Sequence, residues 1–125
     1  MPKPIGLSHE NLKTNAVALS SEWGLRDSDI LLHTLPMYHI HGLLISLNAV
    51  LLSGANLIAT PKFSVEEVMN YLERATIFMG VPTYYHRMLN HPMLKKIDYS
   101  KIRLFISGSA PLSETILAQF RDFTG

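Results

Sequence analysis

The sequence predicts an α/β fold with three layers, in which a mainly parallel sheet is flanked by helices. Four short apolar runs are typical of buried strands, and each leads into a polar or glycine-containing stretch and a proline. They span residues 30–35, 56–60, 77–81 and 102–107. Helix-like segments lie between them. Because parallel strands end at a common sheet edge where ligands bind, the segments after these runs are expected to lie side by side.

The first helix is predicted to begin after Ser8, a good N-cap residue, and to stop at Gly24. Its apolar residues recur at helical spacing and give one inward face: Leu12, Ala16, Leu19 and Trp23. Residues 41–52 are apolar on all sides, which favours a helix buried between the sheet and further protein.

Three further helices have recognisable starts. Ser64 with Glu67 forms the pattern of a capping box. That helix has an inward stripe of Val65, Val68, Met69 and Leu72. Pro82 suits the first turn of a helix over residues 82–90. Ser113 is expected to cap the last helix, whose apolar residues face the sheet: Ile116, Leu117, Phe120 and Phe123.

Composition narrows the class of protein. Of the 125 residues, 47% are hydrophobic and 17% are charged, which argues against disorder. The net charge of +1 gives no electrostatic reason to expect a nucleic-acid partner. Without cysteine there is neither a disulfide framework nor a thiolate metal site. The longest apolar stretch, residues 42–52, is too short for a membrane span. With no signal-peptide pattern at the start, the cytoplasm is the default location.

Both ends of the sequence suggest a piece of a larger protein. No strand precedes the first helix, and the chain stops at Gly125, where another strand is expected to begin. A four-stranded open sheet would also leave two edges unprotected. We therefore expect residues 1–125 to be a partial domain, with the remainder of a larger protein as its partner.

Several polar residues fall at the expected binding edge. His39 and His41 follow the first run, and a His-x-His pattern also allows a metal site, although no third ligand with suitable spacing is present. Arg87 lies about one turn into the helix after Pro82. The stretch from Ser107 to Pro111 is small enough for a flat base to approach the backbone, but it also fits an ordinary strand-to-helix turn.

Four motifs in order resemble the N-terminal domain of the AMP-forming acyl-CoA synthetases, the adenylate-forming superfamily. They are PKPIGLSHENL (2–12), LPMYHIHGL (35–43), MGVPTYYHRML (79–89) and FISGSAPLS (105–113). They resemble, in turn, the end of the phosphate loop with its following helix, the acyl-site segment, a conserved block and the adenine-site strand. Within the family, the pairing of YHIHG with GVPTYYHR is most similar to malonyl-CoA synthetases.

The resemblance implies an ATP-dependent acid–CoA ligase with Mg²⁺, ATP and CoA as its cofactor and co-substrates. His39 then corresponds to the catalytic acyl-site histidine, and His41, Arg87 and Ser107 to residues that bind the carboxylate substrate. Arg87 would pair with a second carboxylate, as in malonate. The nucleotide-binding residues implied are Lys3, Gly108, Ser109, Ala110 and Pro111.

The sequence differs from the family pattern in two respects. Pro4 follows Lys3 where the family usually has glycine, and the Ser/Thr/Gly-rich part of the phosphate loop is absent. The later nucleotide motif and the C-terminal catalytic lysine are also absent, so the segment alone is expected to be inactive. A non-catalytic α/β ligand-binding or interaction domain on the same scaffold remains the main alternative, and a histidine-dependent metalloenzyme is a weaker one.

Overall fold

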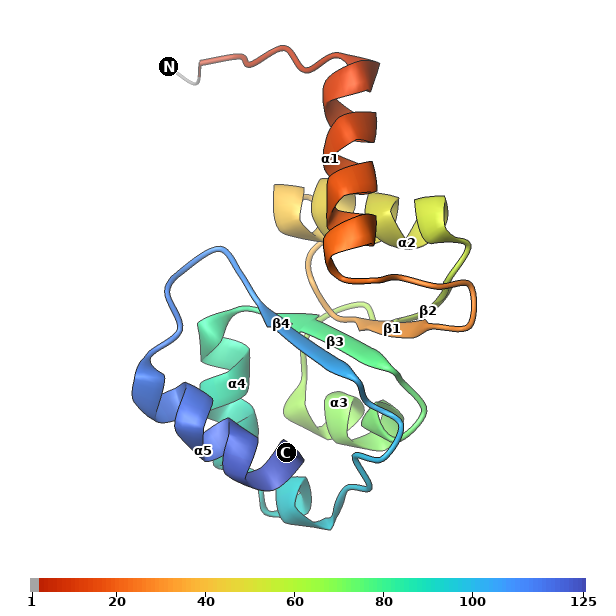
Figure 1. Ribbon diagram of the computed structural model, residues 1–125. Coiled ribbons are helices and arrows are strands. Elements are labelled where there is room, and N and C mark those ends of the chain that lie inside the picture. The colour runs from red at the N-terminus through yellow and green to blue at the C-terminus, as the bar shows by residue number, and fades with distance from the viewer. Residues whose placement is uncertain (1–2) are drawn as a thin grey trace.

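The computed structural model describes residues 3–125 and shows a three-layer α/β/α arrangement (Figure 1). Four strands form one sheet: β1 (Ile30–His33), β2 (Asn56–Ala59), β3 (Ile77–Gly80) and β4 (Leu104–Ser107). All three strand pairings are parallel, in the order β2-β1-β3-β4. The predicted fold class is therefore confirmed. Each strand is one or two residues shorter than its apolar run, since pairing ends where the neighbouring strand ends.

Helices cover both faces of the sheet (Figure 1). On one face lie α1 (His9–Glu22), a π-helix η1 (His41–Leu47) and α2 (Asn48–Ser53). On the other face lie α3 (Val65–Leu72), α4 (Pro82–Leu89) and α5 (Glu114–Thr124), with a short 3₁₀ segment η2 (Pro92–Lys96) between α4 and β4. Within residues 3–125 none of the helices combines the length and the apolar character that a membrane crossing requires.

Each face of the sheet has its own core, because successive strand residues point to opposite sides. Leu31, Ile77 and Met79 pack under α2. Leu32 and Phe78 pack under α3–α5. Strands buried on both faces explain why the strand runs are continuously apolar and do not alternate with polar residues.

The predicted helix starts are confirmed at Ser8, Ser64 and Ser113, whose side chains each accept a hydrogen bond from the backbone N–H three residues on. One detail is wrong: the reciprocal capping box forms at Ser8 with Asn11, whereas Glu67 Oε2 is buried without a partner. The inward stripe of α3 is buried as predicted.

One predicted helix face is also corrected. Leu117 of α5 is 44% exposed and lies outside the core cluster, whereas Phe120 is buried in it. The apolar segment after β1 is a π-helix followed by a short α-helix, and its outer side is open to solvent, with Leu51 68% exposed. The predicted helical character is confirmed, and the burial of this outer side against further protein stays a prediction.

The connections create a switch point between β1 and β3. After β1 the chain turns to the face of η1 and α2, and after β3 it turns to the opposite face with α4 (Figure 1). In open α/β sheets the crevice outside the carboxyl ends of two such strands is the usual ligand site. The segments that follow the four strands all lie at this edge.

Candidate active site

A hollow of about 430 Å³ opens at the switch point, and we call it the histidine hollow. It is bordered by the segment after β1, by the start of α4 and by the loop after β4. Its lining residues are Leu35, Pro36, His39, Ile40, His41, Gly42, Ile45, Val81, Tyr84 and Ser109. Both predicted histidines and one predicted nucleotide-site residue are thus brought together, although they are up to 70 positions apart in the sequence.

His41 connects the acyl-site segment to the loop after β4. Its Nδ1 lies 3.0 Å from Ser109 Oγ, in hydrogen-bonding contact. The ring packs so closely on Gly108 that a Cβ there would lie 2.7 Å from His41 Cε1. Ser109 adopts a left-handed backbone with φ of 67°, which a non-glycine residue adopts at some cost. Strained backbone of this kind concentrates at functional sites.

The two histidines differ in environment. His41 is buried, and burial lowers the pKa of its imidazole below the usual value, so the ring is neutral at neutral pH. A neutral imidazole can accept a hydrogen bond at one nitrogen and donate at the other. His39 is exposed at the mouth of the same hollow, and its ring lies 5.0 Å from that of Tyr38.

The π-helix η1 positions His41 at the edge of the hollow. It begins at His41 itself, directly after the turn that contains Pro36. Gly42 permits the close approach of the two segments, because a Cβ at this position would lie 2.2 Å from Pro36 O. Single π-turns are frequent at functional sites. The sequence pattern gave no sign of this π-turn, and Gly42 was the one residue that could have indicated a close backbone approach.

Arg87 lies in a second, neighbouring hollow of about 720 Å³, which we call the arginine hollow. Leu35, Pro36 and Tyr84 line both hollows, so the two are adjacent. The Arg87 guanidinium lies 5.0 Å from the centre of the Phe63 ring, and Phe63 stacks on Tyr84 with ring centres 3.7 Å apart. This cation–π contact holds the cation at the rim.

Lys62 lines the arginine hollow together with Arg87, so two cationic side chains border it. Neither takes part in the salt bridges found within residues 3–125. Sequence reasoning did not single out Lys62. Its position directly after β2 and Pro61, at the expected binding edge, was the available signal.

The structure does not bring the remaining predicted residues into the histidine hollow. Ser107 points to the same side of the sheet as Phe105, toward α5, and its buried Oγ has no hydrogen-bond partner. Ala110 and Pro111 are exposed in the loop after β4. Lys3 is exposed in the segment ahead of α1.

Tyr85 is a core residue. Its hydroxyl donates a 2.6 Å hydrogen bond to Ile106 O, and burial strongly raises the pKa of its phenol. It therefore contributes packing between α4 and β4, not a site group. Tyr84 lines both hollows, and Tyr38 lines the arginine hollow with 86% of its surface exposed.

The described residues contain no group of three or more His, Asp or Glu side chains placed to hold a metal ion. The His-x-His pair is divided between an exposed ring and a buried ring that contacts Ser109.

Comparison with known proteins agrees with this geometry. The family model of the AMP-binding enzymes matches residues 1–125, and the chain belongs to this family. Human mitochondrial malonate–CoA ligase ACSF3 is 32% identical over 140 residues, covering 99% of this chain and 24% of the relative. The chain thus spans about a quarter of the length of the curated relatives it matches.

Solved structures show the same fold. ATP-bound MatB from Rhodopseudomonas palustris superposes with a TM-score of 0.91 at 42% identity, over 95% of this chain and 24% of that one. A malonyl-CoA ligase in a ternary product complex with methylmalonyl-CoA and AMP gives a TM-score of 0.81 at 32% identity, over 91% of this chain and 26% of that one.

Proposed function

We propose that the full-length protein containing this segment is an ATP-dependent, AMP-forming acid–CoA ligase that prefers a malonate-like dicarboxylate. In the first step a carboxylate oxygen attacks the α-phosphorus of ATP, and pyrophosphate leaves. In the second step the CoA thiol attacks the acyl carbon, and AMP leaves. Residues 1–125 would form part of the AMP-binding N-terminal domain.

One observation carries this proposal: the 3.0 Å contact between His41 Nδ1 and Ser109 Oγ. It joins the LPMYHIHGL segment to the ISGSAP loop at the switch point, where α/β sheets bind ligands. An acyl group and a nucleotide held by these two segments would be neighbours, and reacting groups must be held close together for acyl-AMP to form.

The proposed roles follow the geometry. His39 at the mouth of the histidine hollow would hold the attacking carboxylate by a hydrogen bond, and His41 would contact the acyl part deeper in. Gly108 and Ser109, with Ala110 and Pro111, would border the adenine. Lys3 stays a prediction for phosphate contact. The Ser107 side chain faces α5, so we leave it out of the substrate contacts.

Arg87 supports the dicarboxylate preference. Its guanidinium is exposed, held over Phe63, and lines a hollow adjacent to the histidine hollow. A charge-assisted hydrogen bond to a second carboxylate contributes roughly 1.5–3 kcal/mol. A monocarboxylate would leave this cation without a partner. The relatives named as malonate–CoA ligases agree with this choice of substrate class.

We propose that the 125-residue segment alone has no ligase activity. It spans about a quarter of its relatives, and the described residues supply few groups that could stabilise charge at the transferring phosphate. We also keep the cytoplasm as the proposed compartment, whereas the human relative is named as mitochondrial. Fractionation of cells that express the full-length protein would separate the two.

The test is ATP–pyrophosphate exchange by the full-length protein with malonate, methylmalonate and butyrate. Arg87→Met should lower kcat/KM for malonate about thirtyfold, which corresponds to roughly 2 kcal/mol, and should change butyrate far less. Lys95→Met, which removes a cation that lies over Phe123 in a separate hollow lined by residues of α4 and α5, is the matched control. Equal losses for all acids would show that Arg87 is structural. No exchange with any acid, with nucleotide binding retained, would favour a ligand-binding domain.

A further inference from the structure

A buried histidine that the proposed reaction does not use lies beneath the π-helix. His33, the last residue of β1, is 1% exposed, and its Nδ1 lies 3.0 Å from Ser46 Oγ. Ser46 is fully buried inside η1. Its hydroxyl also donates to Gly42 O at 3.1 Å. A chain of two hydrogen bonds therefore runs from the sheet into the first turn of η1.

The number of protons on the Ser46 hydroxyl determines which group donates in each of these two hydrogen bonds. The Ser46 hydroxyl has one proton, and that proton is on the bond to Gly42 O. Its oxygen can then accept a hydrogen bond from the Nδ1–H group of His33, which assigns the neutral ring a proton at Nδ1. Burial lowers the pKa of His33, so the ring remains neutral at neutral pH and the bond keeps this form.

These two hydrogen bonds can stabilise η1 because it is a π-helix. In a π-helix a backbone N–H reaches the carbonyl five residues back, and the i to i−4 bonds of an α-helix are missing. The Ser46 side chain supplies a bond to the carbonyl four residues back. The turn is held on its other side by the close approach of Gly42 to Pro36 O. His41 is the first residue of this turn, and its ring is directed to Ser109.

We propose that His33 is a positioning residue: acting through Ser46, it fixes the π-turn that presents His41 to Ser109 and to the acyl substrate. His33 lines the arginine hollow but not the histidine hollow, so an effect on the His41 ring must pass through the turn. Ser46 lines neither hollow, so Ser46→Ala separates this positioning role from a direct contact between His33 and the substrate. The kinetic part of this inference rests on the proposed function, and the structural part does not.

The variants distinguish the effect of the hydrogen bond from the effect of side-chain volume. His33→Leu fills a similar volume without a donor. His33→Asn places an amide N–H close to the position of Nδ1 and is expected to restore the bond to Ser46. Ser46→Ala removes the same bond from its other end, together with the bond to Gly42 O, with little change in volume. All are made in the full-length protein, and folding is checked by thermal unfolding.

The first readout is the NMR signal of the His41 ring in histidine-labelled protein, assigned with a His41→Gln variant. We expect His33→Leu and Ser46→Ala to shift this signal in the same way, and His33→Asn to restore the wild-type position. The double variant His33→Leu/Ser46→Ala should shift it no further, since both changes break one chain. This readout does not require a substrate.

The second readout is the KM for malonate in ATP–pyrophosphate exchange. A displaced positioning group costs about 10- to 100-fold. His33→Leu and Ser46→Ala should raise this KM by about that factor, while His33→Asn stays close to wild type. A purely structural residue would lower the amount of active protein and leave KM unchanged.

Unchanged His41 signals in folded His33→Leu and Ser46→Ala proteins would overturn the inference, as would an Asn variant that behaves like Leu. If His33→Leu does not fold, the comparison of the His41 signals of Ser46→Ala and His33→Asn tests whether the hydrogen bond positions the ring. If the wild-type protein shows no exchange with any acid, the proposed function fails, and the NMR comparison still tests the positioning role of His33.

Discussion

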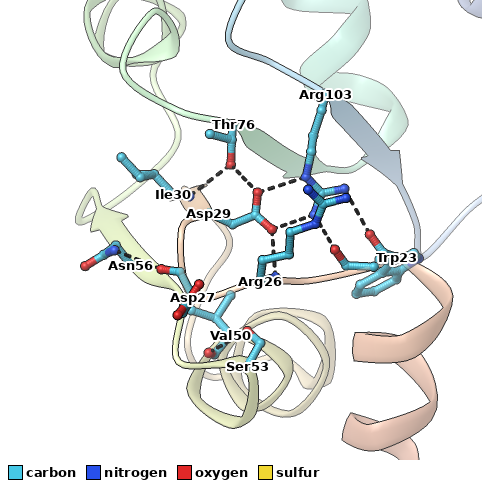
Figure 2. A network of polar contacts seen from close by, with 11 residues as sticks. Trp23, Arg26, Asp27, Asp29, Ile30, Val50, Ser53, Asn56, Thr76 and Arg103 are labelled. Carbon is cyan, nitrogen blue, oxygen red and sulfur yellow. Dashed lines mark hydrogen bonds and ion pairs between the residues drawn. The ribbon is translucent and has the colours of Figure 1, made fainter.

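Asp29 is the charged group whose removal should destabilise this chain most, and Figure 2 shows why. Its carboxylate is 3% exposed and accepts hydrogen bonds from the Arg103 guanidinium, the Thr76 hydroxyl and the Arg26 backbone N–H, at 2.5–2.9 Å. Arg103 also donates to the backbone carbonyls of Trp23 and Gly24, at the end of α1. The network thus links α1 to three neighbouring strands at the amino-terminal edge of the sheet.

The size of this stabilisation follows from the pKa of Asp29. Chiefly through its hydrogen bonds from Arg103, the network lowers the pKa of Asp29 from 3.8 to about 2. A pKa change of one unit corresponds to about 1.4 kcal/mol, so ionised Asp29 stabilises the fold by roughly 2.5 kcal/mol at neutral pH. Asp29→Asn keeps the shape and removes the charge. We expect it to lower the free energy of unfolding by about 2 kcal/mol.

The pH dependence has a definite sign. Because the pKa is lower in the folded chain than in the unfolded chain, the stabilisation is fully present above about pH 4 and is lost as the pH falls toward about 2. The stability difference between wild type and Asp29→Asn should therefore narrow over this range. Urea unfolding of the 125-residue chain, followed by the fluorescence of its single tryptophan, measures it.

The matched control is Glu10→Gln. Glu10 pairs with Lys13 at 4.0 Å, and both side chains are mostly exposed. Glu10→Gln should therefore change the free energy of unfolding by close to zero at every pH. If Asp29→Asn cost no more than Glu10→Gln, or if its cost did not change with pH, the assignment of the stabilisation to the ionised Asp29 carboxylate would be refuted.

Two further predictions concern the site. In the full-length protein, His39→Ala should slow acyl-AMP formation about 100-fold for every acid, whereas His41→Ala should mainly change the preference among acids. ATP–pyrophosphate exchange with malonate and with butyrate measures both effects. If His41→Ala slowed exchange for every acid and His39→Ala changed only the preference, the two proposed roles would be reversed. Gly42→Ala should destabilise the chain by about 2 kcal/mol or more, because its Cβ would collide with Pro36 O; an unfolding midpoint equal to that of the wild type would contradict this reading of the close approach.

The fold class and most element starts could be predicted because they depend on neighbours in sequence. An N-cap serine acts on the N–H three residues ahead, as at Ser8, Ser64 and Ser113. A proline at the first helical position acts on its own φ, as at Pro82. Continuous apolar runs mark strands buried on both faces. The strands and helices are therefore recognisable in the sequence before any of them is packed.

Part of the candidate site was also predictable. Parallel strands end at one edge, so His39, His41 and the loop that contains Ser109 were expected to be near one another, and all three line one hollow. The separation of Arg87 into a second hollow was not expected. It depends on Phe63, which follows a different strand, stacks on Tyr84 and lies under the Arg87 guanidinium.

The sequence by itself determined the alternation of strands and helices, the caps and the common binding edge. Only the tertiary structure decided the strand order β2-β1-β3-β4, the π-turn and the partners of the buried polar groups. Asp29 and Arg103 are 74 residues apart, and neither lies in a local pattern that indicates the other. Local signals act through the backbone of a few adjacent residues, whereas such pairs exist only after the sheet has brought distant strands together.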